Sequence, residues 1–420
     1  MYLIRLTILI PVILISAACS SGPRRAESIS GRGEPIVTVT APRYDETTAV
    51  SPRLIHVRDI HGSGIPYEPP FWHVEDLASD PDGTIYIADR GHAHVLKLDA
   101  EGRYLGTIGQ KGPGPFEFTD AHTMYNMKVC WIDSPGLVAA ADPYYKVLLF
   151  RKNGEVLSDR ITGYYRLIWL MAAVPNGIVI HTNEDPPFTI YDLQSNRTGA
   201  LGRYLSAEDA GWRSVSRALA GSEISAYPDG GVRVSNNLRP NMLSVAADTL
   251  LVHDLNLRNG YRAWNLNTGE VAWQLNLETG DFEPPTFVRY TTGSVGELAS
   301  WSRRGPPQIY ERTYVTSMDY LDGLLFITLS LRGDGTRTGP DRKRAFNPFT
   351  MGDDIGFRDW PQRAALEIIS LEPDLIAHLP FENKGYFNAT IAPGPLLIIS
   401  FRDPEPHLTV YRIEGLPEME

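Results

Sequence analysis

One segment of the chain, residues 74–109, consists of short apolar runs separated by tight-turn sequences. Asp80-Pro81-Asp82-Gly83 follows the first run and Ala100-Glu101-Gly102-Arg103 follows the third. Glycine supplies the positive φ that such turns need, and proline and aspartate shape them. The run Ile85-Tyr86-Ile87 fits the period of a strand. The segment predicts a four-stranded antiparallel meander with strands at Glu75–Ser79, Thr84–Ala88, His94–Asp99 and Tyr104–Ile108.

The same pattern recurs along the rest of the chain. The later copies contain expected strands at Leu137–Ala141, Lys146–Phe150, Val156–Ile161, Ile178–His181, Phe188–Asp192, near Leu201–Leu205, and at Thr249–His253, Tyr261–Asn265, Val271–Leu277, Leu324–Leu329, Ala364–Ser370, Leu375–Leu379, Leu396–Ser400 and Leu408–Arg412. Repeats of about 40–50 residues with four strands each are the sequence signature of a β-propeller. We therefore predict an all-β, six-bladed β-propeller over residues 54–420.

The last copy lacks one strand, which Leu54–Ile60 can supply because it stands alone before the first copy. Strands from both ends of the chain would then close one blade and leave no long unpaired sheet edge. Ile224–Ser235 fits either a decorating hairpin or part of a seventh blade, so seven blades are the alternative. Ser206–Leu219 predicts a short helix, because Ser206 and nearby acidic residues stand at its start.

Residues 1–18 predict a secretory signal peptide. A single charge at Arg5 precedes an apolar run that is too short to span a bilayer as a helix, and small residues follow it. Ile15-Ser16-Ala17-Ala18-Cys19 resembles the bacterial lipobox, in which the cysteine becomes the lipid-bearing first residue. Ser20 after it resembles lipoproteins that are sent to the outer membrane. The alternative is an ordinary secreted protein with a chance cysteine.

Residues 19–53 are rich in Ser, Gly, Pro, Arg and Thr and predict a flexible tether. The other cysteine, Cys130, would have no disulfide partner if Cys19 is acylated, so we interpret it as a buried apolar residue. The net charge is −11, which argues against a nucleic-acid partner.

Residues 74–118 resemble an NHL repeat. The resemblance rests on DPDGTIYIADRGHAHVLKLDAEGRYLGTIG and on the following GPGPFEF, which is similar to an inter-blade loop of NHL-type and bacterial six-bladed propeller lipoproteins. It implies a propeller in the cell envelope. The NHL class includes lyases and lactonases with a metal in the central channel as well as binding propellers, so the resemblance does not imply one activity.

Propeller topology brings the loops between the second and third strands, and the loops between blades, to one face. We predict that this loop-rich face binds the ligand. Its candidate residues are Arg90, His92, His94, Tyr144, Tyr145, Glu184, Asp185, Asp254, Arg258, Arg402 and Asp403.

His92 and His94 have a spacing that two strand neighbours could use for zinc, and His181 and His253 end second strands in other blades. A compact metal motif is missing, so no metal or other cofactor is expected, with zinc or calcium as the alternative. P-loop, dinucleotide-binding and Gly-x-Ser-x-Gly patterns are also missing, and no catalytic residue is identified.

The sequence thus predicts an exported protein, lipid-anchored to the envelope at Cys19 and expected at the outer membrane. Its predicted role is to bind a protein, peptide or glycan. One alternative is an NHL-type lyase or lactonase with a channel metal. The other is a structural scaffold subunit of an envelope complex.

Overall fold

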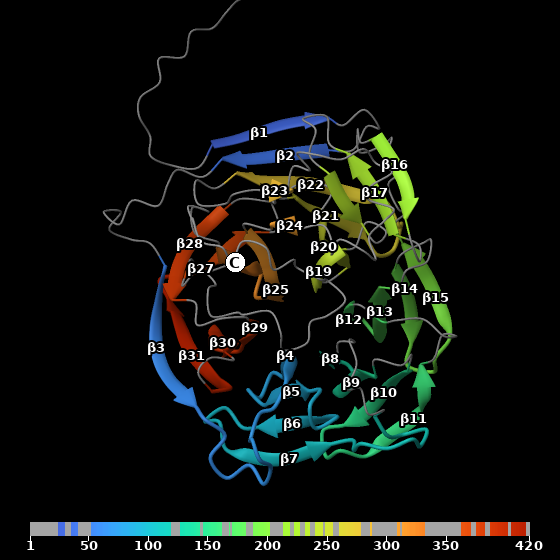
Figure 1. Ribbon diagram of the computed structural model, residues 1–420, viewed down its shortest axis with the longest axis vertical. Coiled ribbons are helices and arrows are strands. Elements are labelled where there is room, and N and C mark those ends of the chain that lie inside the picture. The colour runs from blue at the N-terminus through green and yellow to red at the C-terminus, as the bar shows by residue number, and fades with distance from the viewer. Residues whose placement is uncertain are drawn as a thin grey trace, which may run out of the picture.

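The computed structural model confirms the six-bladed β-propeller (Figure 1). It describes residues 24–29, 35–40, 52–118, 127–142, 146–161, 168, 170–181, 188–201, 213–218, 222–226, 232–235, 240–246, 248–254, 260–278, 286–287, 309–310, 313–331, 363–370, 375–382, 387–401 and 405–416. All regular structure in these ranges is strand. No helix in them has the length and apolar character needed to cross a membrane.

Each blade is a four-stranded antiparallel sheet. Blades 1 to 3 comprise β4 (Val74–Ser79), β5 (Ile85–Asp89), β6 (His94–Leu98), β7 (Tyr104–Ile108); β8 (Lys128–Ile132), β9 (Leu137–Asp142), β10 (Lys146–Arg151), β11 (Val156–Ile161); and β12 (Leu170–Val174), β13 (Gly177–His181), β14 (Phe188–Asp192), β15 (Arg197–Leu201). Blades 4 to 6 comprise β19 (Pro240–Ala246), β20 (Thr249–Asp254), β21 (Gly260–Asn265), β22 (Val271–Glu278); β25 (Thr313–Leu321), β26 (Leu324–Leu331), β27 (Arg363–Ser370), β28 (Leu375–Glu382); and β29 (Phe387–Ala392), β30 (Leu396–Phe401), β31 (His407–Glu414), β3 (Arg53–Ile60).

The hydrophobic core lies between blades. Six clusters of buried side chains occur in the described residues, one at each interface between neighbouring blades. Between blades 1 and 2, for example, Tyr86 and Val95 pack with Val138 and Phe150. The first strands β4, β8, β12, β19, β25 and β29 form the innermost ring (Figure 1). The apolar runs of the sequence are therefore continuous because both faces of each blade are covered.

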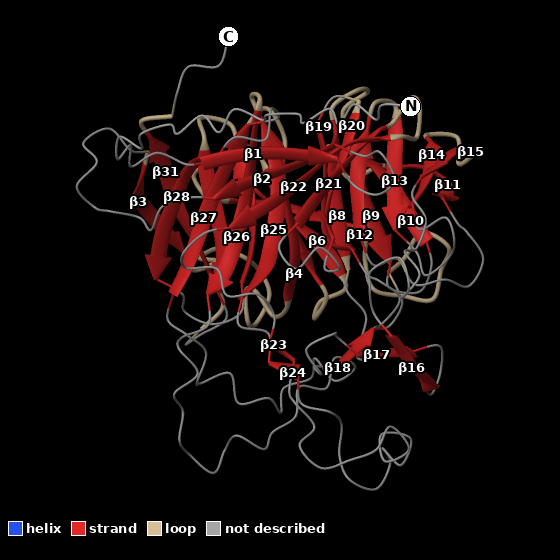
Figure 2. Ribbon diagram, turned by 90° about the horizontal axis from the view of Figure 1, so that it is seen from above, coloured by secondary structure: helices blue, strands red, loops and turns tan. Residues whose placement is uncertain are grey.

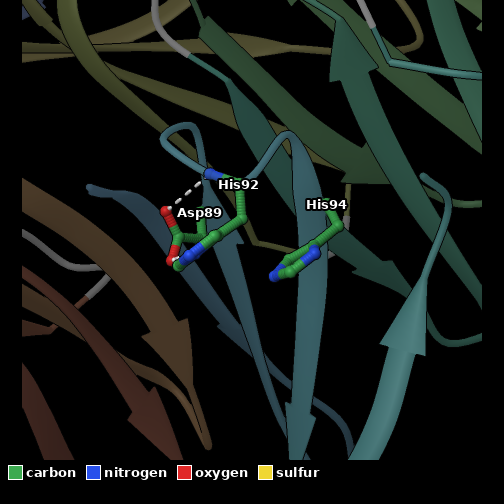
Figure 3. A group of neighbouring side chains, drawn as sticks. All are labelled: Asp89, His92 and His94. Carbon is green, nitrogen blue, oxygen red and sulfur yellow. Dashed lines mark hydrogen bonds and ion pairs between the residues drawn. The ribbon is translucent and has the colours of Figure 1, made fainter. Parts of the chain in front are cut away.

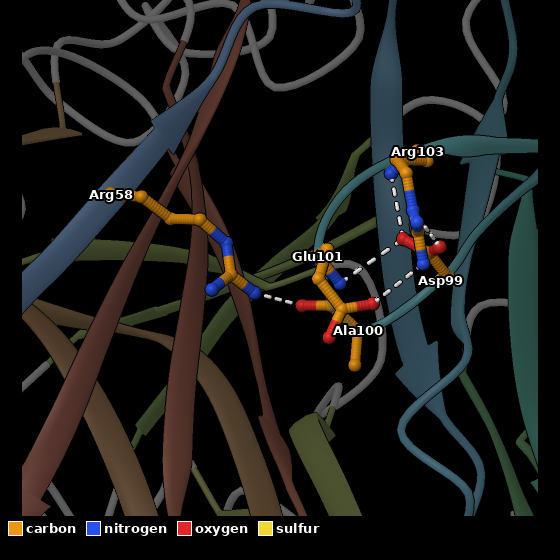
Figure 4. Close-up of polar contacts among 5 residues, drawn as sticks. All are labelled: Arg58, Asp99, Ala100, Glu101 and Arg103. Atoms are coloured by element: carbon orange, nitrogen blue, oxygen red, sulfur yellow. Dashed lines mark hydrogen bonds and ion pairs between the residues drawn. The ribbon is translucent and has the colours of Figure 1, made fainter.

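The predicted closure of the ring is confirmed. β3 pairs antiparallel with β31, from Arg53 opposite Glu414 to Ile60 opposite Leu408. The same strand also reaches blade 1, because the Arg58 guanidinium donates to the carbonyl of Ala100 in the turn after β6 (Figure 4). Asp99 holds that turn by accepting from the backbone N–H groups of Glu101 and Arg103.

Two insertions lie outside the ring. The sheet of β16 (Arg213–Ala218), β17 (Ser222–Ala226) and β18 (Val232–Ser235), and the pair β23 (Thr286–Phe287) and β24 (Ile309–Tyr310), stand on one side of the disc (Figure 2). The region around Ile224 is therefore a decoration and not a seventh blade. The helix prediction over Ser206–Leu219 is wrong for β16, because β16 pairs with β17 over its whole length and Ser and Val at alternate positions favour a strand.

Part of the segment predicted as a flexible tether is paired structure. β1 (Arg24–Ile29) and β2 (Pro35–Thr40) form a hairpin, and β2 pairs in parallel with the outer strand β22, from Ile36 opposite Gln274 to Thr40 opposite Glu278. All residues from Ile36 to Thr40 are β-branched, which fits a strand that covers a sheet edge. Residues 24–29 and 35–40 therefore extend blade 4.

Candidate functional site

A cavity of about 800 Å³ lies within the ring of innermost strands. We call the connection between the first and second strands of a blade its first turn, and the next connection its second turn. The cavity wall combines side chains of the six innermost strands with first-turn residues such as Asp80, Asp133, Asn176, Asp322 and Gly394. Its rim therefore lies on the face of the disc that carries the first turns.

Two aspartates inside the cavity bond to the next blade. Asp76 of β4 accepts from the backbone N–H of Val129 in β8 at 3.1 Å. Asp319 of β25 accepts from the backbone N–H of Ile391 and from the Thr390 hydroxyl in β29. Each carboxylate thus links the innermost strands of consecutive blades.

Burial changes the acidity of both aspartates. Loss of water raises the pKa of Asp76, although Lys128 and the Val129 N–H favour its charged form. Loss of water, with the charge of Asp76 added, raises the pKa of Asp319 to about 8. Asp319 is therefore largely protonated at neutral pH, and a cation close to it would favour its ionised form.

The aspartates of the first turns differ in burial and in hydrogen bonding. Asp80 is buried and accepts from the Thr84 N–H at 2.9 Å, the Tyr86 hydroxyl at 2.9 Å and Lys152 Nζ at 2.6 Å. Asp133 and Asp322, in the turns of blades 2 and 5, are exposed at the rim. Asp80 therefore stabilises its turn, and the other two carboxylates face solvent.

The described lining of the cavity is acidic. It contains five aspartates and a single basic residue, Lys128, and none of its residues is a histidine. A metal ion in the channel, as the enzyme alternative requires, would need several side chains that can coordinate it. Asp76 already bonds to a backbone N–H, and Asp319 is largely protonated. The described channel residues therefore do not fit a histidine-held metal.

The predicted binding face is the opposite side of the disc, where the second strands of the blades end and the third strands begin, and where β16 to β18 and the pair β23 and β24 stand (Figure 2). Several of its candidate residues lie outside the described residues: Tyr144, Tyr145, Glu184, Asp185, Arg258, Arg402 and Asp403. The proposed lipid site, Cys19, also lies outside them. For His253 and Asp254 the structure describes only the backbone, at the end of β20. That these residues share one surface therefore stays a prediction.

Arg90 lies in the second turn of blade 1, as expected, but it is not a free surface anchor. Its Nε is 3.2 Å from Glu75 Oε1, and the two side chains are 12% and 5% exposed. Its backbone N–H donates to the carbonyl of His73. The arginine therefore belongs to a buried ion pair.

His92 and His94 lie side by side, with ring centroids 5.2 Å apart and planes 16° from parallel (Figure 3). Asp89, which sequence analysis did not select, completes the group because its Oδ2 lies 2.9 Å from His92 Nδ1. The sequence did contain a signal for Asp89, because an aspartate lies three residues before His92 on the other side of a tight turn. His181 lies in blade 3 with its ring against Phe188, and it is not among the residues that line the cavity.

No model of a protein family matches the sequence, and no curated protein matches it. A solved protein from Bacteroides fragilis, named as a presumed exported protein, is similar with a TM-score of 0.51 at 11% identity, over 89% of this chain and 98% of that chain. A member of the DUF4221 family from Bacteroides vulgatus has a TM-score of 0.45 at 11% identity, over 87% and 99%. The WD40 β-propeller domain of Doa1 has a TM-score of 0.42 at 11% identity, over 85% and 96%. At 11% identity the likeness concerns the fold alone, and the likeness of residues 74–118 to an NHL repeat stays a prediction.

Proposed function

We propose that this chain is an exported, lipid-anchored propeller that binds a basic segment of a protein or peptide at the first-turn mouth of its central cavity. The observation that carries the proposal is the acidic lining, with five aspartates and one lysine. A site with an excess of one charge sign attracts ligand groups of the opposite charge, and here the exposed carboxylates of Asp133 and Asp322 at the rim supply that excess. The net charge of −11 acts in the same direction at long range.

The cavity has room for side chains and not for a folded domain. Its volume of about 800 Å³ is within the usual range of ligand pockets. A lysine or arginine side chain would pass the exposed carboxylates of Asp133 and Asp322 before it reached Asp319.

Lipid attachment is the part of the proposal that rests on the sequence. The apolar run and small residues before Cys19 support processing as a lipoprotein, and acyl chains would hold the propeller at a membrane surface. Metabolic labelling with a palmitate analogue tests it, because Cys19→Ala should abolish the label. Retained label in that variant would overturn the attachment site.

The binding proposal is tested by calorimetric titration of the protein with tetralysine at low salt, with tetraglutamate as the opposite-charge control. We expect binding of tetralysine alone, with an affinity that falls as salt is added because the exposed charges are screened. Replacing both rim carboxylates, as Asp133→Asn with Asp322→Asn, should weaken binding about five- to tenfold, since exposed charge contacts contribute about 1 kcal/mol or less each.

The matched control is Glu155→Gln. Its carboxylate is 62% exposed on the turn after β10, on the same face of the disc but outside the cavity lining. This variant should bind tetralysine like the unmodified protein. Equal affinity for the two peptides, or an unchanged affinity in the double rim variant, would contradict the proposal.

A further inference from the structure

We propose that His92, His94 and Asp89 form a binding site for a divalent transition-metal ion of the zinc type, in the second turn of blade 1 and outside the central cavity. This site is independent of the proposed binding of basic segments. It rests on two imidazoles and one carboxylate that the turn between β5 and β6 brings together (Figure 3).

Asp89 is held in place by the backbone. It ends β5 and lies directly opposite His94, the first residue of β6. Its Oδ1 accepts from the N–H groups of His73 at 2.9 Å and Gly91 at 3.0 Å, and its Oδ2 accepts from the Trp72 N–H at 2.9 Å. Such fixed support is typical of the shell that orients metal ligands.

Besides the Trp72 N–H, Asp89 Oδ2 contacts His92, and a metal ion could take the place of this second contact. His92 Nδ1 lies 2.9 Å from Oδ2, and this contact needs a proton on one of the two atoms. A metal ion could replace that proton while Oδ1 keeps its backbone bonds. Burial alone would raise the pKa of Asp89, but the bonds from His92 and from the Trp72 and His73 N–H groups outweigh it and hold the pKa below its usual range.

His94 supplies the independent observation. His94 is only 5% exposed, and its Nε2 has no hydrogen-bond partner in the part of the chain that the structure describes. A buried polar atom without a partner costs free energy, so such an atom in a well-packed turn needs an explanation. An ion bound at Nε2 supplies the missing partner.

The geometry and chemistry favour a transition metal. One donor atom from each residue lies within 4.8 Å of the other two. Zinc–nitrogen bonds are about 2.0–2.1 Å long, so a movement of the histidine rings on the order of 1 Å would close the donors around one ion. Imidazole donors select zinc, nickel, cobalt or copper over calcium and magnesium, which prefer oxygen.

The aromatic residues around the group limit the motion of the two histidine rings and leave a metal ion access from the surface. The Tyr67 ring lies against both imidazoles, with centroids 5.1 Å from His92 and 4.6 Å from His94. Trp72 packs edge-on against His92 and is half exposed, so the group lies just below the surface. The protein provides three donors, which leaves coordination positions for water or for a ligand group.

Cobalt(II) is the probe for the test, because its visible absorption reports nitrogen and oxygen ligands directly. Titration of the full protein should show one equivalent bound, with zinc displacing the cobalt. His94→Gln should weaken cobalt binding by at least about tenfold. His56→Gln is the matched control, because exposed His56 also lies three residues from an aspartate, with Nε2 3.2 Å from Asp59, but belongs to no such group.

Circular dichroism establishes that each variant is folded. If His94→Gln does not fold, zinc-dependent melting of the unmodified protein replaces it, since an ion that binds only the folded state must raise the Tm. Failure of cobalt to bind, an unchanged affinity in folded His94→Gln, an equal loss in His56→Gln, or an unchanged Tm at 100-fold excess zinc would overturn the proposal.

Discussion

The central cavity and the second turn of blade 1 both place aspartates among buried strands, but they differ in the polar atoms beside those aspartates. In the cavity, Asp76 and Asp319 each accept from the backbone of the next blade. In the turn, Asp89 accepts from several N–H groups, yet the neighbouring His94 Nε2 has no hydrogen-bond partner among the described residues. Buried carboxylates in this fold therefore act first as links between segments, and the unpartnered nitrogen is the better indicator of a ligand.

The largest expected effect is that of Asp89→Ala. The substitution removes the acceptor of the Trp72, His73 and Gly91 N–H groups and of His92, which leaves buried donors unsatisfied. We expect the free energy of unfolding to fall by about 3 kcal/mol or more, because each such donor costs about 1–3 kcal/mol. Urea denaturation followed by circular dichroism measures it.

Asp82→Ala is the control, because this aspartate is 83% exposed in the first turn of the same blade. It should change the free energy of unfolding by no more than about 0.5 kcal/mol. Similar losses in the two variants would mean that the bonding around Asp89 has no special role.

The second expected effect concerns Asp319 and depends on pH. Its pKa of about 8 in the folded protein exceeds the value of 3.8 for a free side chain, so the folded state binds more protons between these values. Stability contributed by the unmodified Asp319 therefore falls as pH rises from about 4 to about 8. The amide introduced by Asp319→Asn would not ionise, can accept from the Ile391 N–H and can donate to the Thr390 hydroxyl.

Asp319→Asn should therefore be more stable than the unmodified protein at pH 8, by about 1–2 kcal/mol, because water in the cavity reduces the full effect. At pH 4.5 the difference should be close to zero. Urea denaturation at the two pH values measures it. A variant that is less stable at pH 8, or equally shifted at both values, would show that Asp319 is a charged link between blades 5 and 6.

The propeller could be predicted because the strands and turns that define each blade are close together in the sequence. Turns such as Asp80-Pro81-Asp82-Gly83 recur between apolar strands. The last repeat lacks one strand, and Leu54–Ile60 supplies it by pairing with β31. β1 and β2 were missed because an edge strand is stabilised by its partner, here β22, which lies more than 200 residues away in the chain. The helix prediction over β16 failed for another reason, since Ser206 and the nearby acidic residues are only a helix-start signal, whereas β16 pairs with the next strand, β17.

The site was less predictable than the fold. His92 and His94 were selected from their spacing, but Asp89 directly follows the predicted strand Thr84–Ala88, and only the folded turn shows its contact with His92. Arg90 was expected at the surface because it follows a strand, and its partner Glu75 comes from another strand. Asp76 in blade 1 and Asp319 in blade 5 come within electrostatic range of each other only when the ring of blades closes around the channel.

The smallest expected effect tests the unpartnered nitrogen itself. Burial, with the charge of His92 added, lowers the pKa of His94 to about 4 in spite of Asp89, so its ring is neutral at pH 7. Without metal, His94→Leu removes a buried polar atom that makes no hydrogen bond and keeps a side chain of similar size. We expect the free energy of unfolding to stay equal or to rise by up to about 1 kcal/mol, measured by urea denaturation in the presence of a chelator. With zinc added, the order should reverse, because only the unmodified protein gains stability from the ion. A loss of 2 kcal/mol or more in the chelated protein would instead mean that His94 Nε2 has a bonded partner in the folded state, which would remove the contrast between this turn and the cavity.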